Sequence, residues 1–177
     1  MALPARIYLL GYMGSGKSFS GKRLARQLDR PFIDLDDYIE EVDGRRIPDI
    51  FEESGEAFFR QLEAETLRKT AAWQGIVISC GGGTPCFHDN MAWIKNNGLS
   101  IYLKAPSQWL AERLLPEMEH RPLIKDLLPE MLPAFIQDKL TQREPFYLQA
   151  DLIFDQAAPR HLEANALYDF IYTHCQH

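Results

Sequence analysis

The chain has 177 residues, a length typical of one domain, and it is 46% hydrophobic and 25% charged, as in ordinary globular proteins. Its net charge of −6 argues against general nucleic-acid binding, and no apolar run approaches the roughly 20 residues of a membrane-spanning helix. A cleavable signal peptide would remove a glycine-rich loop near the N-terminus, so we expect a cytoplasmic protein.

Strands and helices are predicted to alternate along the whole chain. The predicted strands are Ile7–Leu10, Phe32–Asp34, Ile76–Ser79, Ser100–Leu103 and Asp151–Phe154. The predicted helices are Lys17–Leu28, Asp36–Glu41, a short one that begins near Pro48, Glu56–Ala72, His88–Lys95, Pro106–Leu115, Pro133–Arg143 and Arg160–His174. This alternation predicts one three-layer α/β domain over residues 1–177, with a parallel five-stranded sheet.

The first predicted strand leads into a phosphate-binding loop. Residues 11–18 read Gly-Tyr-Met-Gly-Ser-Gly-Lys-Ser and fit the pattern G-x-x-x-x-G-K-[ST] completely, between a strand and a helix. Glycines let backbone N–H groups turn toward phosphate oxygens, and the helix N-terminus adds partial positive charge. Lys17 would reach the β- and γ-phosphates of ATP, and the Ser18 hydroxyl would bind Mg²⁺. The expected nucleotide-binding residues of this loop are Gly14, Ser15, Gly16, Lys17, Ser18 and Phe19.

Acidic residues cluster where the second predicted strand ends, at Asp34, Asp36 and Asp37. In open α/β sheets the ligand lies beyond the carboxyl ends of the strands. Asp34 and Asp36 share a face if the chain between them is extended. A kinase needs one carboxylate that helps to hold Mg²⁺ and another that orients or deprotonates the attacking hydroxyl. The alternative is that these residues cap the following helix, and for Asp37 we favour that role.

The segment Pro116–Pro133 is charged and framed by prolines, and we expect a mobile lid at about residues 116–132. Lids exclude water from phosphoryl transfer, and Arg121 within this lid could neutralise charge on the transferred group. A plain surface loop is the alternative. Arg113 either joins the phosphate or adenine side of the nucleotide or pairs with a nearby glutamate, Glu112 or Glu117.

The ordered set of motifs resembles that of the shikimate kinases over nearly the whole chain. Besides the phosphate loop and Asp34-Leu35-Asp36, it comprises IFEESGEAFFR (50–60), GGG (81–83), RPL (121–123) and REPFY (143–147). The SGEAxFR motif and the triple glycine are far more specific than a phosphate loop alone. The resemblance implies the P-loop fold of nucleoside monophosphate kinases, with a five-stranded parallel sheet, a substrate-binding region at about residues 34–62 and a lid.

The resemblance also implies the reaction. In such enzymes MgATP phosphorylates the 3-hydroxyl of shikimate, a step toward chorismate and the aromatic amino acids. The positions that match shikimate-binding residues of the family are Asp36, Arg60, Gly82 and Arg143. The metal would be held by Ser18 and Asp34, and Arg121 matches a lid arginine that reaches the ATP phosphates. The catalytic residues implied are therefore Asp36 as the proposed base, Lys17 and Arg121.

Arginine suits the carboxylate of shikimate, because a planar guanidinium can form two parallel hydrogen bonds with it. Arg60 and Arg143 could hold one end of the ring while Asp36 engages the other. The alternative for Arg60 is a surface salt bridge with Glu56 or Glu63, both at helical spacing. Phe59, beside Arg60, either lines the substrate pocket or belongs to the core.

Two other functions stay open at this point. One is a related small-molecule kinase that acts on gluconate or a nucleotide, and the other is a nucleotide-binding module without catalysis.

The expected partners are ATP and shikimate, with no nucleic acid or membrane, and we expect a monomer. Mg²⁺ is the expected metal, while the three cysteines favour reduced thiols. The contacts with adenine stay open. Members of the family often have a basic residue near the adenine after the last strand, whereas in this chain the first basic residue there is Arg160.

Overall fold

A computed structural model of the chain describes residues 3–121, 123–159 and 165–175. Five parallel strands form one sheet in the order β2-β3-β1-β4-β5. The strands are β1 (Arg6–Leu10), β2 (Phe32–Asp34), β3 (Ile76–Ser79), β4 (Leu99–Lys104) and β5 (Leu152–Asp155). All five predicted strands are confirmed, and their bounds lie within one residue of the predicted ones.

The helices follow the predicted alternation with the strands. They are α1 (Lys17–Gln27), α2 (Leu35–Asp43), α3 (Ile47–Lys69), α4 (Asn90–Asn97), α5 (Ser107–Leu114), α6 (Leu132–Tyr147) and α7 (Ala166–Cys175). Helix α3 combines two predicted helices, and Gly55, with φ 81° and ψ 171°, interrupts its helical geometry between them. The predicted helix Arg160–His174 begins outside the described residues and is described from Ala166. Within the described ranges, no helix is both long and apolar enough to cross a bilayer.

The lid region contains short 3₁₀ segments instead of one regular helix. These are η3 (Leu115–His120) and η4 (Pro129–Met131), which lie between α5 and α6. Ile124, between them, is fully buried in the same core cluster as side chains of α5 and α6. The region is thus attached to the domain through an apolar contact of its own.

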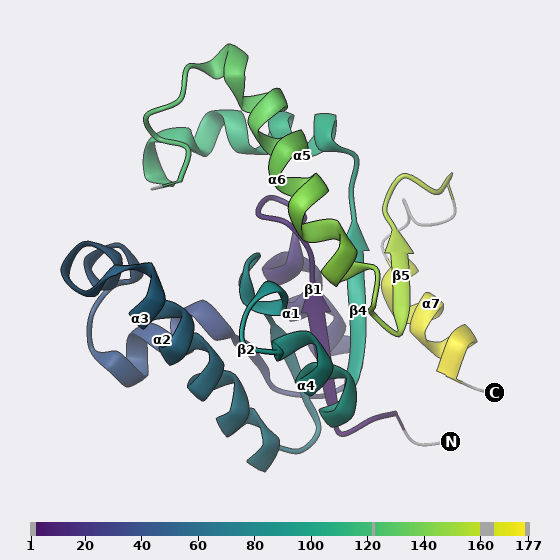
Figure 1. Cartoon of the computed structure of the whole chain (residues 1–177). Coiled ribbons are helices and arrows are strands. Elements are labelled where there is room, and N and C mark those ends of the chain that lie inside the picture. Colours follow the sequence, from purple (N-terminus) through teal and green to yellow (C-terminus); the bar gives the residue numbers. More distant parts are fainter. Residues whose placement is uncertain (1–2, 122, 160–164, 176–177) are drawn as a thin grey trace.

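Side chains of β1 alternate between the two faces of the sheet. Tyr8 and Leu10 pack in a core cluster with α2, α3 and α4, whereas Ile7 and Leu9 pack in another with α1 and α7. A third cluster packs α5 and α6 against Tyr102 of β4. The sheet therefore lies between two layers of helices, which confirms the predicted three-layer α/β fold (Figure 1).

The carboxyl ends of the strands form the functional edge of this sheet. The strand order reverses at β1, which lies between β3 and β4, and such a switch point is where open α/β sheets bind ligands. The glycine-rich loop follows β1, Asp34 ends β2, and the triple glycine follows β3. Figure 1 shows α5 and α6 extending beyond this edge, with α2 and α3 beside it.

Candidate active site

The loop after β1 encloses the ammonium group of Lys17. Lys17 Nζ donates to the carbonyl oxygens of Gly11 (2.9 Å) and Tyr12 (3.0 Å), and the residue is only 9% exposed. Gly16 caps α1 with φ 82°, in the left-handed region that favours glycine. The Ser15 hydroxyl is buried and has no hydrogen-bond partner among the described residues. The curled backbone, the helix N-terminus and the buried ammonium are the features expected of an anion-binding site.

Ser18 and Asp34 meet beside this loop. Ser18 Oγ donates to Asp34 Oδ2 at 2.5 Å, which brings together the two oxygen ligands expected for magnesium. Asp34 Oδ1 accepts the backbone N–H of Asp36 at 3.2 Å, so Asp34 is the N-cap of α2. The prediction that Asp37 caps this helix is wrong, because α2 already begins at Leu35. Asp36 lies in the first turn of α2, within the predicted helix, so the chain between the two acids is not extended and the shared face that depended on this does not apply.

Burial is the main cause of the pKa shifts of Lys17 and Asp36. Burial lowers the pKa of Lys17 to about 8, against the effect of Asp36 and Asp34, and Arg121 adds to the lowering. Burial raises the pKa of Asp36 to about 7, with contributions from Asp34 and Glu63 and an opposing one from Lys17. A carboxyl group whose pKa lies near neutrality is suited to accept a proton at that pH.

The triple-glycine loop Gly81–Gly83 brings three predicted site residues together. A Cβ atom on its first glycine would lie 2.7 Å from Asp36 Oδ1, and one on its third glycine 2.7 Å from Arg60 Nη1. A Cβ atom on the middle glycine would lie 3.5 Å from Arg143 Nη1, an ordinary contact distance. Asp36, Arg60 and Arg143 therefore face one short loop, and a side chain at its first or third position would displace Asp36 or Arg60.

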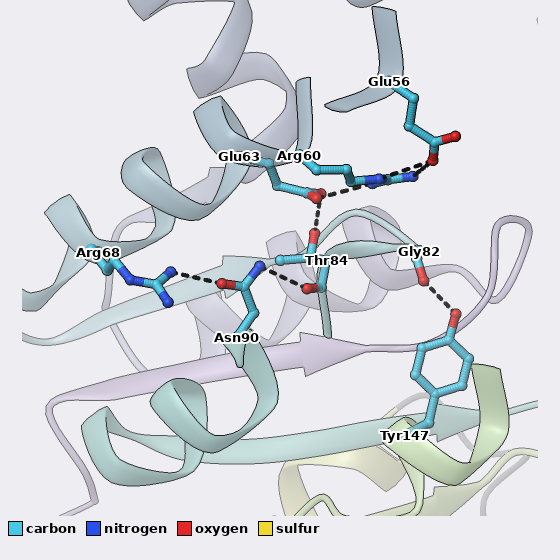
Figure 2. A network of polar contacts seen from close by, with 8 residues as sticks. All are labelled: Glu56, Arg60, Glu63, Arg68, Gly82, Thr84, Asn90 and Tyr147. Atoms are coloured by element: carbon cyan, nitrogen blue, oxygen red, sulfur yellow. Dashed lines mark hydrogen bonds and ion pairs between the residues drawn. The ribbon is translucent and has the colours of Figure 1, made fainter. Parts of the chain in front are cut away.

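Two glutamates hold the guanidinium of Arg60 against this loop. Arg60 Nη1 donates to Glu63 Oε2 at 2.9 Å, while Nε and Nη2 donate to Glu56 Oε1 at 3.2 Å (Figure 2). The predicted ion pairs of Arg60 with Glu56 and with Glu63 are thus both present. The side chain of Arg60 is 9% exposed and that of Glu63 only 1%. The Arg60–Glu63 pair is therefore buried, whereas the side chain of Glu56 is 60% exposed, so the pairing with Glu56 reaches the surface as the alternative expected.

The buried network continues from Glu63 to the segment after the glycines. Glu63 Oε1 accepts the Thr84 hydroxyl at 2.6 Å, and the Thr84 carbonyl accepts Asn90 Nδ2 at 2.9 Å. Asn90 Oδ1 in turn accepts Arg68 Nη1 at 2.7 Å, as Figure 2 shows. Sequence reasoning did not assign Glu63, Thr84 or Asn90 to the site. The one available signal was the three-residue spacing between Arg60 and Glu63, which places both on one helix face.

Aromatic rings complete the surroundings of Arg60. Its guanidinium carbon lies 4.3 Å from the centroid of Phe87 and 5.1 Å from that of Phe59. Phe59 is 4% exposed, and its ring centroid lies 4.6 Å from that of Phe51. Of the two roles considered for Phe59, the structure favours the core. Phe87, which the sequence did not single out, is partly exposed and closer to the guanidinium.

Arg143 approaches the triple glycine from α6. Its guanidinium carbon lies 5.5 Å from the ring centroid of Tyr12, so it contacts the phosphate loop as well as the middle glycine. One turn further along α6, the Tyr147 hydroxyl donates to the Gly82 carbonyl at 2.5 Å. Neither tyrosine was assigned a role in the site from the sequence, although Tyr12 lies in the phosphate-loop motif and Tyr147 ends the REPFY motif.

The other predicted site residues, Arg121, Arg113 and Phe19, lie away from the triple-glycine loop. Arg121 donates to the Glu117 carboxylate within the lid, through Nε at 3.0 Å and through Nη2, so its partner in this conformation is not the phosphate loop. Arg113 Nη1 donates to the carbonyl of Gly14 at 3.2 Å, which favours the nucleotide side over pairing with a glutamate. The side chain of Phe19 is 74% exposed, so a nucleotide contact of this residue would come from its backbone.

The loop after β5 also touches the phosphate loop. Gln156 Nε2 donates to the Ser15 carbonyl at 3.0 Å, and Gln156 Oε1 accepts Arg113 Nη1 at 3.3 Å. This glutamine, which sequence reasoning did not assign to the site, connects the two segments next to the nucleotide side. Arg160, the basic residue noted after the last strand, lies outside the described residues.

Known proteins have a similar sequence and the same fold. Residues 13–171 match a family model described as shikimate kinase. A shikimate kinase from Azobacteroides pseudotrichonymphae genomovar. CFP2 is 46% identical over 150 residues, which cover 84% of this chain and 88% of that protein. The crystal structure of shikimate kinase from Bacteroides thetaiotaomicron has a TM-score of 0.88 at 39% identity, covering 96% of this chain and 98% of its own.

A second solved structure adds a bound small molecule to this comparison. Shikimate kinase from Acinetobacter baumannii in complex with shikimate has a TM-score of 0.84 at 33% identity. The match covers 98% of this chain and 96% of that one. Because the sequence match and the shared fold both extend over most of its length, this chain belongs to the shikimate kinase family.

Proposed function

We propose that this chain is a shikimate kinase, which transfers the γ-phosphoryl group of ATP to the 3-hydroxyl of shikimate and yields shikimate 3-phosphate and ADP. The observation that carries the proposal is the meeting of Asp36, Arg60 and Arg143 around the triple-glycine loop. Shikimate carries a carboxylate and three ring hydroxyls, so two guanidinium groups and a proton acceptor match its two ends. The product would serve the synthesis of chorismate and the aromatic amino acids.

Arg60 and Arg143 would bind the shikimate carboxylate, together with the backbone of Gly82. Glu63 and Glu56 each accept hydrogen bonds from Arg60, which limits the directions in which its remaining N–H groups can point. Fixing the carboxylate from two sides orients the ring, and orientation alone can supply a large share of the rate increase. Asp36 would then select the 3-hydroxyl, position it for in-line attack and accept its proton.

ATP would bind along the phosphate loop, through Gly14, Ser15, Gly16, Lys17, Ser18 and the backbone of Phe19. Ser18 and Asp34 fit Mg²⁺, because a hydroxyl and a carboxylate meet beside the phosphate loop and magnesium is commonly held by one or two carboxylates together with phosphate oxygens. When bound, the ion supplies positive charge that stabilises the phosphates. Lys17 adds its ammonium at the same phosphates, at the position where the loop already encloses it.

The lid would close over the bound nucleotide. We infer that residues of about 116–132 move so that Arg121 exchanges Glu117 for the ATP phosphates, which would neutralise charge and exclude water.

We further infer one domain over residues 1–177, with a substrate-binding region at about 34–62, that acts as a cytoplasmic monomer without nucleic-acid or membrane partners. Asp36 and Arg60 both lie in that region.

The proposed function is tested by an acceptor screen in which ADP release is coupled to an optical signal. Shikimate should stimulate ADP release from ATP, whereas gluconate and nucleoside monophosphates should leave it at the background rate. Stimulation by one of those acceptors, with none by shikimate, would identify a related small-molecule kinase. ATP binding without stimulation by any acceptor would instead favour a nucleotide-binding module.

Replacing Arg60 with lysine is expected to raise the KM for shikimate about tenfold, because a point charge replaces a planar fork while the net charge is kept. The KM for ATP should stay within about twofold, since the phosphate loop is untouched. Arg45→Lys is the matched control, because Arg45 also pairs with a carboxylate, that of Asp43, but outside the site. An unchanged shikimate KM in Arg60→Lys would refute the carboxylate-binding role.

The affinity for shikimate is expected to rise with pH across neutrality. The pKa of Asp36 is raised to about 7, so its carboxyl group is protonated below that pH and ionised above it. The ionised carboxylate is the stronger hydrogen-bond acceptor for a ring hydroxyl. Calorimetric titration without nucleotide between about pH 6 and about pH 8 should therefore show a falling Kd. Asp36→Asn should lose this dependence, and a variant that keeps it would assign the titration to another group.

A further inference from the structure

A hydrogen bond joins the two segments that form opposite sides of the proposed shikimate site. The Tyr147 hydroxyl donates to the Gly82 carbonyl at 2.5 Å, across 65 residues of sequence. Tyr147 is fully buried in the last turn of α6, and Gly82 is the middle residue of the loop after β3 (Figure 2). The bond therefore connects the helix that carries Arg143 with the loop that Arg143 faces.

The bond also restrains the peptide group between Gly82 and Gly83. A run of three glycines has many accessible backbone conformations, so neighbouring contacts must select one of them. Because a trans peptide group is planar, holding the Gly82 carbonyl also sets the opposite direction of the Gly83 N–H. At the end of the loop, the Thr84 hydroxyl and carbonyl are both hydrogen-bonded, to Glu63 and Asn90. Tyr147 provides the corresponding restraint at the middle of the loop.

Arg143 and Tyr147 lie four residues apart on α6, so their side chains leave the same face of one helix. Burial raises the pKa of the Tyr147 hydroxyl above its ordinary value, with the positive charge of Arg143 acting against the shift. The hydroxyl is accordingly a neutral donor at physiological pH. Arg143 and Tyr147 both approach Gly82, one with its guanidinium and the other with its hydroxyl. Their helix cannot move relative to the glycine loop without stretching this bond.

We propose that Tyr147 is a positioning residue for shikimate binding, whose hydroxyl holds the Gly82–Gly83 peptide at the separation from Arg143 that the substrate carboxylate requires. The inference rests on the proposed function, because it assigns the carboxylate to Arg143 and Gly82. Tyr147 itself does not contact the substrate in this scheme. It acts through the glycine loop, so its loss should affect the acceptor and leave the nucleotide unaffected.

The test is Tyr147→Phe, which removes one oxygen atom and keeps the ring packed on Tyr102, at a centroid distance of 5.0 Å. The KM for shikimate should rise about tenfold, the size expected when a buried carbonyl loses its hydrogen bond. The KM for ATP should remain within about twofold of the wild-type value. Calorimetric titration of shikimate without nucleotide should show the same loss of affinity, which separates binding from turnover.

Tyr102→Phe is the matched control. It removes a hydroxyl from the neighbouring ring, and that hydroxyl donates to Glu144 at 3.3 Å instead of to the glycine loop. Its shikimate KM should stay within about twofold of the wild-type value. An equal rise in the two variants would show a general effect of losing a buried hydroxyl and would overturn the proposal.

Other outcomes of Tyr147→Phe decide the question as well. If the wild-type enzyme uses shikimate, an increase of less than about threefold in the shikimate KM of Tyr147→Phe would overturn the positioning role. An equal rise in both KM values, or a variant that does not fold, would show that the bond supports the fold and not the acceptor site. A wild-type enzyme without shikimate-dependent ADP release would instead remove the proposed function on which the inference rests.

Discussion

Replacing Asp36 with asparagine is expected to reduce turnover with shikimate at least about 100-fold while ATP binding persists. Asparagine keeps the shape of the side chain and its place in the first turn of α2, but its amide cannot accept the proton of the attacking hydroxyl. The carboxyl group of Asp36 lies against the first glycine of Gly81–Gly83, where Arg60 and Arg143 would present the substrate. A loss of this size corresponds to general-base catalysis by one positioned group.

Rates of ADP release at saturating shikimate and a fluorescence titration with a nucleotide analogue would measure the two effects separately. Asp37→Asn is the matched control, because Asp37 is an exposed acid one position away on the same helix. It should retain nearly full turnover. Turnover of Asp36→Asn near that of the wild type would show that Asp36 orients the hydroxyl at most and does not remove its proton.

Replacing Lys17 with methionine is expected to lower kcat about 100- to 1000-fold, the range found when one preorganised charge-stabilising donor is removed. Methionine has a similar length, so the apolar part of the buried side chain is retained. The ammonium is lost at the centre of the loop, where the Gly11 and Tyr12 carbonyls now hold it and where the ATP phosphates would lie. The charge that develops on the transferred group then lacks this partner.

The KM for ATP should also rise in Lys17→Met, whereas shikimate binding without nucleotide should stay close to that of the wild type. Lys22→Met on the same helix is the control, because Lys22 is exposed and lies 5.8 Å from the Phe32 ring centroid, away from the loop. A decrease in kcat below about tenfold in Lys17→Met would contradict the assignment of Lys17 to the transferred phosphate.

Local patterns in the sequence determined the elements and the phosphate loop. The glycines are spaced with Lys17 and Ser18 between an apolar strand and a helix, and this pattern predicts a phosphate loop. The conformation of such a loop is set by residues that are close in sequence. The loop observed after β1 has the predicted form, with the lysine ammonium inside it. The alternation of strands and helices similarly predicted the parallel sheet, because parallel strands require crossover connections.

Prediction was less accurate where small local differences decide the outcome. Asp34 and Asp37 can both cap a helix, and the observed start of α2 at Leu35 makes Asp34 the cap. Alternative start positions of a helix differ little in free energy, because one capping hydrogen bond contributes only about 1 kcal/mol. Asp36 lies in the first turn of this helix, and its carboxyl group lies against the first glycine of Gly81–Gly83.

The sequence alone predicted the candidate site residues: the loop lysine, the acids, the arginines and the triple glycine. Their hydrogen-bond partners became evident only from the packing of the folded chain. The buried hydrogen bond from Thr84 to Glu63 and the bond from Tyr147 to Gly82 join segments that are distant in the chain. No local spacing encodes these contacts, because they form only when β3, α3 and α6 pack around one edge of the sheet.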